Sequence, residues 1–200
     1  MNKSNDVSTT VECLLEGGVV LLPTDTVYGL AALPTKPKAV EGIFELKSRP
    51  KHQTLPIMVA SVNDLNRMGL DLNTNAKKLL ASSYIPGAVT LVLGFENGPL
   101  LPWLQGREEV AIRIPNDQWL LDVLEKTGPL LVTSANKHGQ PITPVTVDEI
   151  LAELNGTPDL VVDGGIRNDN SSTIINCRVD PPSVQRNGKI SPDELFNILQ

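Results

Sequence analysis

Short apolar runs alternate along this chain with longer stretches in which apolar residues recur at helical spacing. The short runs are typical of buried strands, and the longer stretches are typical of amphipathic helices. We therefore predict strands at residues 19–22, 55–59, 89–93, 110–114, 130–133, 160–162, 173–176 and 183–185. We predict helices at residues 38–47, 61–68, 75–83, 117–126 and 146–154, an earlier one that ends at Glu16, and a last one that starts after Ser191. This alternation indicates an α/β fold.

Local signals mark some of the element ends. Thr9 followed by Glu12 predicts a capping box at the first helix, and Ser191 followed by Glu194 predicts another at the last helix. Pro56 falls inside the 55–59 strand run. Because proline cannot donate a hydrogen bond to a neighbouring strand, we expect this strand at a sheet edge or the proline at the strand's start.

The composition is that of an ordinary folded domain. A chain of 200 residues, 40% hydrophobic and 20% charged, needs no metal or disulfide to fold, and we expect residues 1–200 to form one domain. The two cysteines, Cys13 and Cys177, lack C-x-x-C spacing and favour a reduced compartment. Residues 1–7 are polar, and no apolar run approaches the length of a membrane span. We therefore expect a cytoplasmic protein with no membrane contact.

Charge and histidine content exclude further classes. Seventeen Lys and Arg against 23 Asp and Glu give a formal net charge of −6. This total argues against nonspecific nucleic-acid binding, but it is compatible with a local basic cleft. His52 and His138 lie far apart, without a cysteine at ligand spacing. We therefore expect no metal site built from protein side chains.

Candidate chemistry lies in the loops that follow strands, where ligands of open α/β sheets usually bind. The common phosphate loops, GxxxxGK[ST] and GxGxxG, are absent, and so is the GxSxG nucleophile motif. Thr24, Asp25 and Thr26 follow the first strand. Two hydroxyls and a carboxylate suit the ammonium and hydroxyl of a small zwitterion, but they equally suit a strand-to-helix turn.

Cations form the second group of candidates. Lys47 and Arg49 stand at the end of a predicted helix, just before Pro50. A chain that leaves its helix there can bring both cations to one anion, although cations at a helix C-terminus are common without any ligand. Arg186 precedes an Asn-Gly pair, which predicts a cation at the tip of a turn.

Arg113 is the most unusual charge because it lies within the apolar run 110–114. Burying an unpaired guanidinium is costly, so this residue needs a partner or a cleft. We expect it to be shielded and to pair with a substrate carboxylate, and we expect the fold to tolerate Arg113→Leu. The turns TSAN at 133–136 and SSTII at 171–175 supply further hydroxyls, although such sequences also serve as plain turns.

Seven segments, taken in order, resemble the motifs of the YrdC-like threonylcarbamoyl-AMP synthases. They are PTDTVYGL at 23–30, KSRP at 47–50, PGAVTLV at 86–92, VAIRIP at 110–115, TSAN at 133–136, STII at 172–175 and RNGKI at 186–190. Each motif alone is a weak signal. Seven in the right order, spread over nearly the whole chain, are a strong one.

The resemblance implies a twisted, open, mixed sheet with flanking helices around a large, positively lined cavity. It implies a nucleotidyltransferase that converts L-threonine, bicarbonate and ATP into threonylcarbamoyl-AMP and pyrophosphate, the first step toward threonylcarbamoyl-adenosine in tRNA. Mg²⁺ would bridge the phosphates of ATP rather than occupy a cage of protein ligands. Catalysis would rest on positioning and charge neutralisation, and the sequence identifies no general base.

The resemblance also assigns roles to individual residues. Threonine contacts fall to Thr26, Arg113, Ser134 and Ser172. Nucleotide contacts fall to Arg49, Gln53, Asn136 and Arg186, and catalytic roles fall to Lys47 and Arg49, with Lys47 near the phosphates. Met58 stands where family members often have a threonine-contacting histidine, and ITP at 142–144 replaces the common SPT. With its end at Gln200, the chain resembles the short, single-domain members.

Two other interpretations of these motifs stay open. One is a double-stranded RNA-binding module of this fold without synthase activity, and the other is a carbamoyl-adenylate-handling domain like those inside larger maturation enzymes. The negative net charge of the chain and the intact Lys47/Arg49 and Ser134/Asn136 pairs favour the synthase over the RNA-binding module. The lack of an attached zinc finger argues against the second alternative. Contact with double-stranded RNA, tRNA or downstream tRNA-modification proteins stays open.

Overall fold

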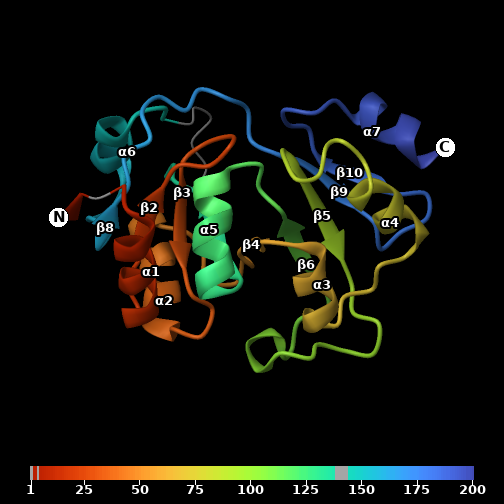
Figure 1. Cartoon of the computed structure of the whole chain (residues 1–200), viewed down its shortest axis with the longest axis horizontal. Coiled ribbons are helices and arrows are strands. Elements are labelled where there is room, and N and C mark those ends of the chain that lie inside the picture. The colour runs from red at the N-terminus through yellow and green to blue at the C-terminus, as the bar shows by residue number, and fades with distance from the viewer. Residues whose placement is uncertain (1, 4, 138–143) are drawn as a thin grey trace.

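The computed structural model describes residues 2–3, 5–137 and 144–200, and the ten strands found there form one mixed, open sheet (Figure 1). The strands are β1 (Asn2–Lys3), β2 (Val20–Leu22), β3 (Gly29–Ala32), β4 (Ile57–Met58), β5 (Val89–Leu93), β6 (Val110–Arg113), β7 (Leu130–Ser134), β8 (Leu160–Val161), β9 (Thr173–Asn176) and β10 (Ser183–Arg186). Their order is β1-β8-β2-β3-β7-β4-β6-β5-β9-β10. The sheet contains both parallel pairs, such as β4–β6 and β5–β9, and antiparallel pairs, such as β3–β7 and β4–β7. The predicted α/β fold with an open, mixed sheet and flanking helices is confirmed.

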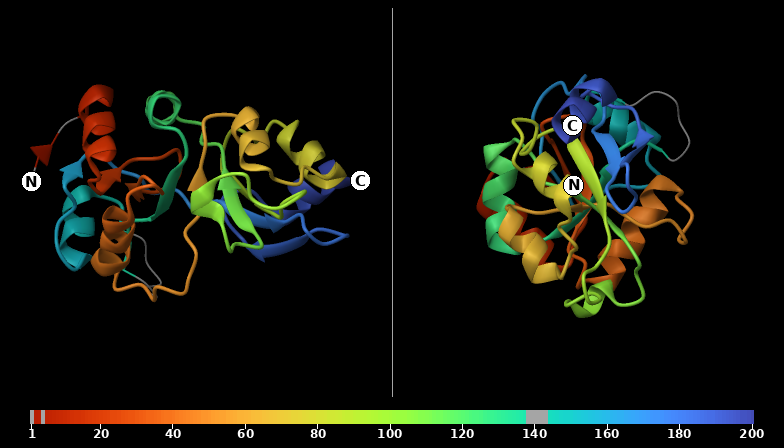
Figure 2. Two further views of the ribbon diagram at one scale, coloured as in Figure 1. Left: turned by 90° about the horizontal axis from the view of Figure 1, so that it is seen from below. Right: turned by 90° about the vertical axis from the view of Figure 1, so that its right-hand side faces the viewer.

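Helices flank both halves of this sheet. They are α1 (Val7–Glu16), α2 (Pro37–Lys47), α3 (Val62–Met68), α4 (Thr74–Leu80), α5 (Gln118–Thr127), α6 (Val147–Glu153) and α7 (Pro192–Leu199), with a short 3₁₀ turn η1 (Pro102–Leu104). In Figure 1, α1, α2 and α6 lie with β2, β3 and β8 in one half, and α3, α4 and α7 lie with β5, β9 and β10 in the other. Figure 2 shows the molecule extended along the direction that joins the halves. Within the described ranges, no helix has the length and apolarity needed to cross a membrane.

The alternation of side chains explains how the two halves differ. In β2, Val20 and Leu22 pack with apolar residues of α1 and α5, while Leu21 packs on the opposite face in the main core. In the other half, the main core takes one face of β5 and β6 together with residues of α3, α4 and α7. The opposite face of these strands carries Thr90 and Arg113, which line a cavity.

The start of the first helix differs from the prediction. Asp6 is the N-cap, and its carboxylate accepts a hydrogen bond from the backbone N–H of Thr9 at 2.9 Å. The expected Thr9–Glu12 capping box is therefore wrong. Asp6 is itself a favourable N-cap residue, and the helix starts there, three residues before Thr9. The capping box of Ser191 and Glu194 is confirmed.

Two further differences concern the sheet. The turn after β2 leads into β3, a strand that the sequence pattern did not predict, so the chain forms a β2–β3 hairpin and not a strand-to-helix turn. Gly29 in β3 is required by close packing, because a Cβ there would lie 2.7 Å from a methyl group of Val132 in β7. Pro56 immediately precedes β4. Since β4 lies inside the sheet between β7 and β6, the proline marks the start of a strand and not a sheet edge.

Candidate active site

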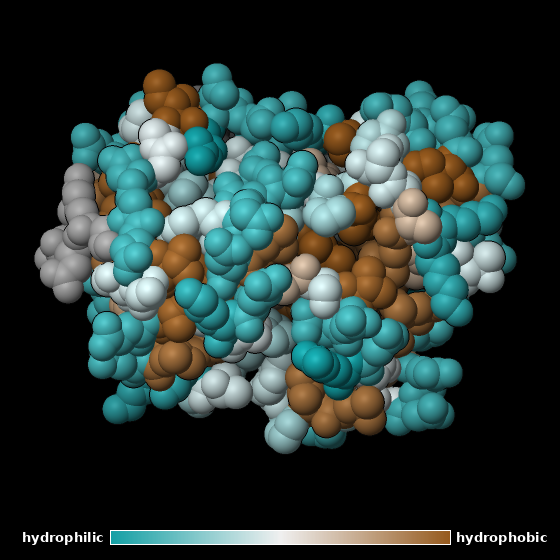
Figure 3. All heavy atoms as spheres, in the orientation of Figure 1, coloured by the Kyte–Doolittle hydropathy of each residue, from teal (hydrophilic) through white to brown (hydrophobic). Residues whose placement is uncertain are grey.

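A cavity of about 280 Å³ lies between the two halves, slightly below the range of about 300–1,000 Å³ usual for ligand pockets. Its walls come from the β2–β3 turn and β7 on one side and from β5, β6 and β9 on the other. Hydrophobic residues reach the surface between the halves (Figure 3). Three arginines, Arg49, Arg113 and Arg186, line the cavity, and none of its described lining residues is an aspartate or glutamate. The cavity is therefore suited to an anion.

Six of the predicted site residues line this cavity together, namely Thr26, Arg49, Arg113, Ser134, Ser172 and Arg186. Three do not. Lys47 and Asn136 lie directly behind Ser134, because the ammonium of Lys47 donates hydrogen bonds to the backbone carbonyls of Ser134 and Asn136. Gln53 lies in the turn after α2, where its backbone N–H donates to the carbonyl of Pro50 at 3.1 Å.

Arg113 is shielded, as expected, with 5% of its surface exposed. Its guanidinium already has three partners. Nη2 lies 2.8 Å from a carboxylate oxygen of Asp25, Nη1 donates to the hydroxyl of Thr26 at 2.8 Å, and Nε donates to the carbonyl of Gly87 at 3.0 Å. Burial lowers the pKa of Arg113, and the Asp25 carboxylate opposes that shift. A guanidinium has five N–H groups, so two of them have no partner in the part of the chain that the structure describes.

The β2–β3 turn is held by its own threonines. The hydroxyl of Thr24 donates to the carbonyl of Val27 at 2.7 Å and accepts from the backbone N–H of Thr26 at 3.1 Å. These contacts are those of an ordinary side-chain-stabilised turn. They also hold the Thr26 hydroxyl in place beside Arg113, which donates to it.

Ser172 and Arg186, predicted as contacts to different substrates, contact each other. Arg186 donates from Nε and Nη2 to the Ser172 carbonyl at 3.1 and 2.8 Å, and from Nη2 to the Ser172 hydroxyl at 3.1 Å. Thr90, which the sequence analysis did not single out, shares a 2.7 Å hydrogen bond with that hydroxyl. Its sequence signal is a polar residue inside an apolar strand run. Burial, and secondarily Arg113, lower the pKa of Arg186.

Glycine at position 188 permits this arrangement. A Cβ on Gly188 would lie 2.3 Å from the Ser171 carbonyl oxygen and 2.4 Å from backbone atoms of Ser172 and Thr173. The backbone N–H of Lys189 donates to the Ser171 carbonyl at 2.9 Å. The turn that follows Arg186 therefore lies directly against the backbone of residues 171–173, in the same wall of the cavity.

Arg49 has the most available donors of the three arginines. Nη2 donates to the Thr54 carbonyl at 3.1 Å, while Nε is buried without a hydrogen-bond partner in the described part of the chain. Burial lowers the pKa of Arg49, but arginine stays protonated in proteins. An unpartnered donor at a cavity wall is suited to an anionic ligand.

Met58, which stands where relatives often have histidine, lines the same cavity. His138 and residues 142 and 143 lie outside the described residues. Among the residues that the structure does describe, no three His, Cys, Asp or Glu side chains group as metal ligands.

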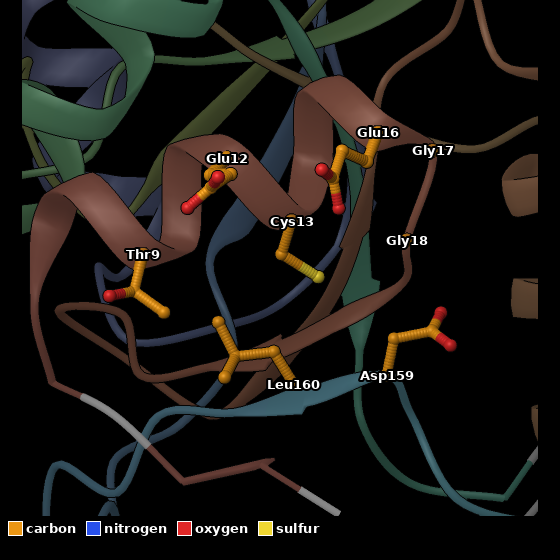
Figure 4. A pocket seen from close by; sticks show the side chains of 8 residues that line it. All are labelled: Thr9, Glu12, Cys13, Glu16, Gly17, Gly18, Asp159 and Leu160. Carbon is orange, nitrogen blue, oxygen red and sulfur yellow. The ribbon is translucent and has the colours of Figure 1, made fainter.

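A second pocket, of about 490 Å³, lies between α1 and β8 (Figure 4). It is lined by Glu12, Glu16 and Asp159 around Cys13 and, among its described lining residues, contains no Lys or Arg. Burial, and secondarily Asp159 and Glu16, raise the pKa of Cys13 to about 11. Its charge does not suit an anion, and its thiol is not activated.

Comparison with known proteins identifies the family of this chain. The family model Sua5/YciO/YrdC, described as "Telomere recombination", matches residues 12–188, and the chain belongs to this family. Threonylcarbamoyl-AMP synthase of Bacillus subtilis is 33% identical over 196 residues, which cover 96% of this chain and 56% of that protein. The chain thus spans little more than half of that relative.

Two solved structures agree in fold. Sua5 of Pyrococcus abyssi, complexed with L-threonine, superposes with a TM-score of 0.86 at 29% identity, covering 99% of this chain and 59% of that one. Escherichia coli YciO superposes with a TM-score of 0.80 at 25% identity, covering 98% of this chain and 97% of that one.

Proposed function

We propose that the chain catalyses formation of threonylcarbamoyl-AMP. L-threonine, bicarbonate and ATP would give threonylcarbamoyl-AMP, pyrophosphate and water, as the first step of a tRNA modification. One observation carries the proposal: residues from all seven motifs meet at a cavity that has three arginines and, among its described lining residues, no carboxylate. The names of the relatives, and the threonine complex of the Pyrococcus protein, support the choice of reaction.

The threonine end of the cavity would be built on Arg113. Its two unused N–H groups are available for a carboxylate, and the pair with Asp25 holds the guanidinium in place. The hydroxyls of Thr26, Ser134 and Ser172 would contact the polar groups of threonine. Because the lining residues extend from Thr24 to Arg186, both halves of the sheet would act as one catalytic unit.

The nucleotide end would be built on Arg49 and Arg186, with Asn136 and Gln53 as outer contacts. Two guanidinium groups would neutralise phosphate charge that develops as pyrophosphate leaves. Mg²⁺ would enter with ATP as part of the substrate. Fixed donors and a partly closed cavity would hold the carbamate close to the α-phosphate, which is catalysis by positioning.

The test is pyrophosphate release by the purified chain. We expect release only when L-threonine, bicarbonate and ATP are all present, and we expect it to stop when any one is omitted. Release that ignores threonine or bicarbonate would contradict the proposal. Submicromolar, strongly salt-dependent binding of duplex RNA without any release would favour the RNA-binding module instead.

A further inference from the structure

Lys47 is a buried cation placed behind the cavity and not in its wall. It is the last residue of α2, and 2% of its surface is exposed. In the described part of the chain it forms no ion pair, and its hydrogen-bond acceptors are the backbone carbonyls of Ser134 and Asn136. Of these residues, only Ser134 lines the cavity.

The contacts of Lys47 fall on one turn. Ser134 ends β7, and its hydroxyl donates to the side-chain oxygen of Asn136 at 2.6 Å. Between them, the backbone N–H of Ala135 donates to the carbonyl of Tyr28 at 2.8 Å. Among the described residues, Lys47 is the shared side-chain donor to these two carbonyls, and a buried carbonyl without a donor is destabilising. Lys47 therefore completes the hydrogen bonding of the turn that presents Ser134 to the cavity.

The protonation state of Lys47 is consistent with this task. Burial, and secondarily the charge of Arg49, lower the pKa of Lys47 to about 7. A neutral amine keeps two N–H groups, and there are two carbonyls to accept them. The contacts therefore do not depend on the charge that a phosphate ligand would require.

We propose that Lys47 is a positioning residue that acts on the substrates through Ser134 and Asn136, and not by contact with a phosphate. Its kinetic consequences rest on the proposed function. Loss of Lys47 should then weaken threonine use through Ser134 as well as nucleotide use through Asn136. A direct phosphate contact would instead affect ATP and pyrophosphate and leave threonine unchanged.

Three variants separate these roles. Lys47→Met keeps the length of the side chain and removes the donors, and Lys47→Gln supplies a shorter neutral donor in case the methionine variant does not fold. Lys78→Met is the matched control, because Lys78 donates to the carbonyl of Leu199, away from the cavity. We expect both Lys47 variants to raise the KM for threonine about tenfold or more, and the control to leave it unchanged.

A second measurement is independent of activity. Hydrogen exchange at the Ala135 amide reports whether the turn is held, and it should quicken about tenfold or more in the Lys47 variants but not in Lys78→Met. Unchanged exchange, or a kinetic defect confined to ATP, would overturn the positioning role. If the wild-type chain releases no pyrophosphate, the proposed function fails, while the exchange measurement still decides whether Lys47 holds the turn.

Discussion

The guanidinium of Arg113 lies 2.8 Å from the carboxylate of Asp25, and the two side chains are only 6% and 12% exposed. The pair joins β6 to the β2–β3 turn, two segments that are 88 residues apart. It gives Arg113 a fixed orientation in the cavity wall before any substrate is present. It also changes what a substitution at Arg113 should do.

We expect Arg113→Leu to lower the free energy of unfolding by about 3 kcal/mol, since it leaves the partly buried Asp25 carboxylate without this partner. The sequence-based expectation of a tolerated leucine is therefore replaced. Asp25→Asn added to Arg113→Leu should recover part of the loss, because it removes the unpaired charge. Denaturant unfolding measures both. Lys51→Leu breaks the exposed pair with Glu41 and, as a control, should change stability by less than about 1 kcal/mol. An Arg113→Leu variant as stable as the wild type would show that the pair with Asp25 does not stabilise the fold.

Arg49→Ala should impair ATP use. A charge-assisted hydrogen bond contributes about 1.5–3 kcal/mol, so kcat/KM for ATP should fall roughly ten- to hundredfold. Arg49→Lys should not restore it, because an ammonium lacks the planar fork of donors. The control is Arg67→Ala, whose side chain is 78% exposed and pairs with Asp64 on the surface. ATP kinetics identical in the Arg49 and Arg67 variants would exclude Arg49 from the site.

Gly188→Ala should disturb the wall formed by Ser172 and Arg186. A methyl group cannot fit 2.3 Å from the Ser171 carbonyl oxygen, so the turn must move away and stretch the hydrogen bonds from Arg186 to Ser172. We expect kcat/KM for both threonine and ATP to fall at least about tenfold. Gly94→Ala is the control, because its added Cβ would meet its nearest atom at 3.5 Å. Equal activity of the two variants would show that the turn can shift without consequence.

The sequence predicted the fold class and most elements because buried strands and amphipathic helices leave distinct periodicities. It missed β3, whose sequence Gly-Leu-Ala-Ala has small residues with weak strand preference. Its strand character comes from pairing on both sides, with β2 and β7. Such tertiary pairing leaves no local pattern.

The candidate site was predictable as a set of residues but not as a set of contacts. An arginine in an apolar strand signals that it needs a partner, yet nothing local identifies Asp25 as that partner. Likewise, Lys47 beside Arg49 indicates a paired anion clamp, whereas the fold turns Lys47 toward two backbone carbonyls. Partner choice depends on the order of strands in the sheet, which spacing along the chain does not encode.

The pKa of Lys47 predicts how stability changes with pH. Burial lowers this pKa to about 7 in the folded chain, while an unfolded lysine titrates near 10.4. Between about pH 7 and pH 10 the unfolded state therefore binds a proton that the folded state does not. Raising the pH through this window favours the folded state, by up to about 1.4 kcal/mol per unit.

Lys47→Met lacks this titration and serves as the reference. The free energy of unfolding of the wild type, measured relative to that variant, should rise from about pH 7 to about pH 10 and stay level below about pH 6, where both states are protonated. The pH dependence of the wild type is also measured relative to Lys78→Met, in which the lost lysine donates to the Leu199 carbonyl. This second difference gives the effect of removing one positive charge from the chain, and it is subtracted from the first. Parallel pH profiles for the wild type and Lys47→Met would mean that Lys47 stays charged in the folded protein, held by the carbonyls of Ser134 and Asn136.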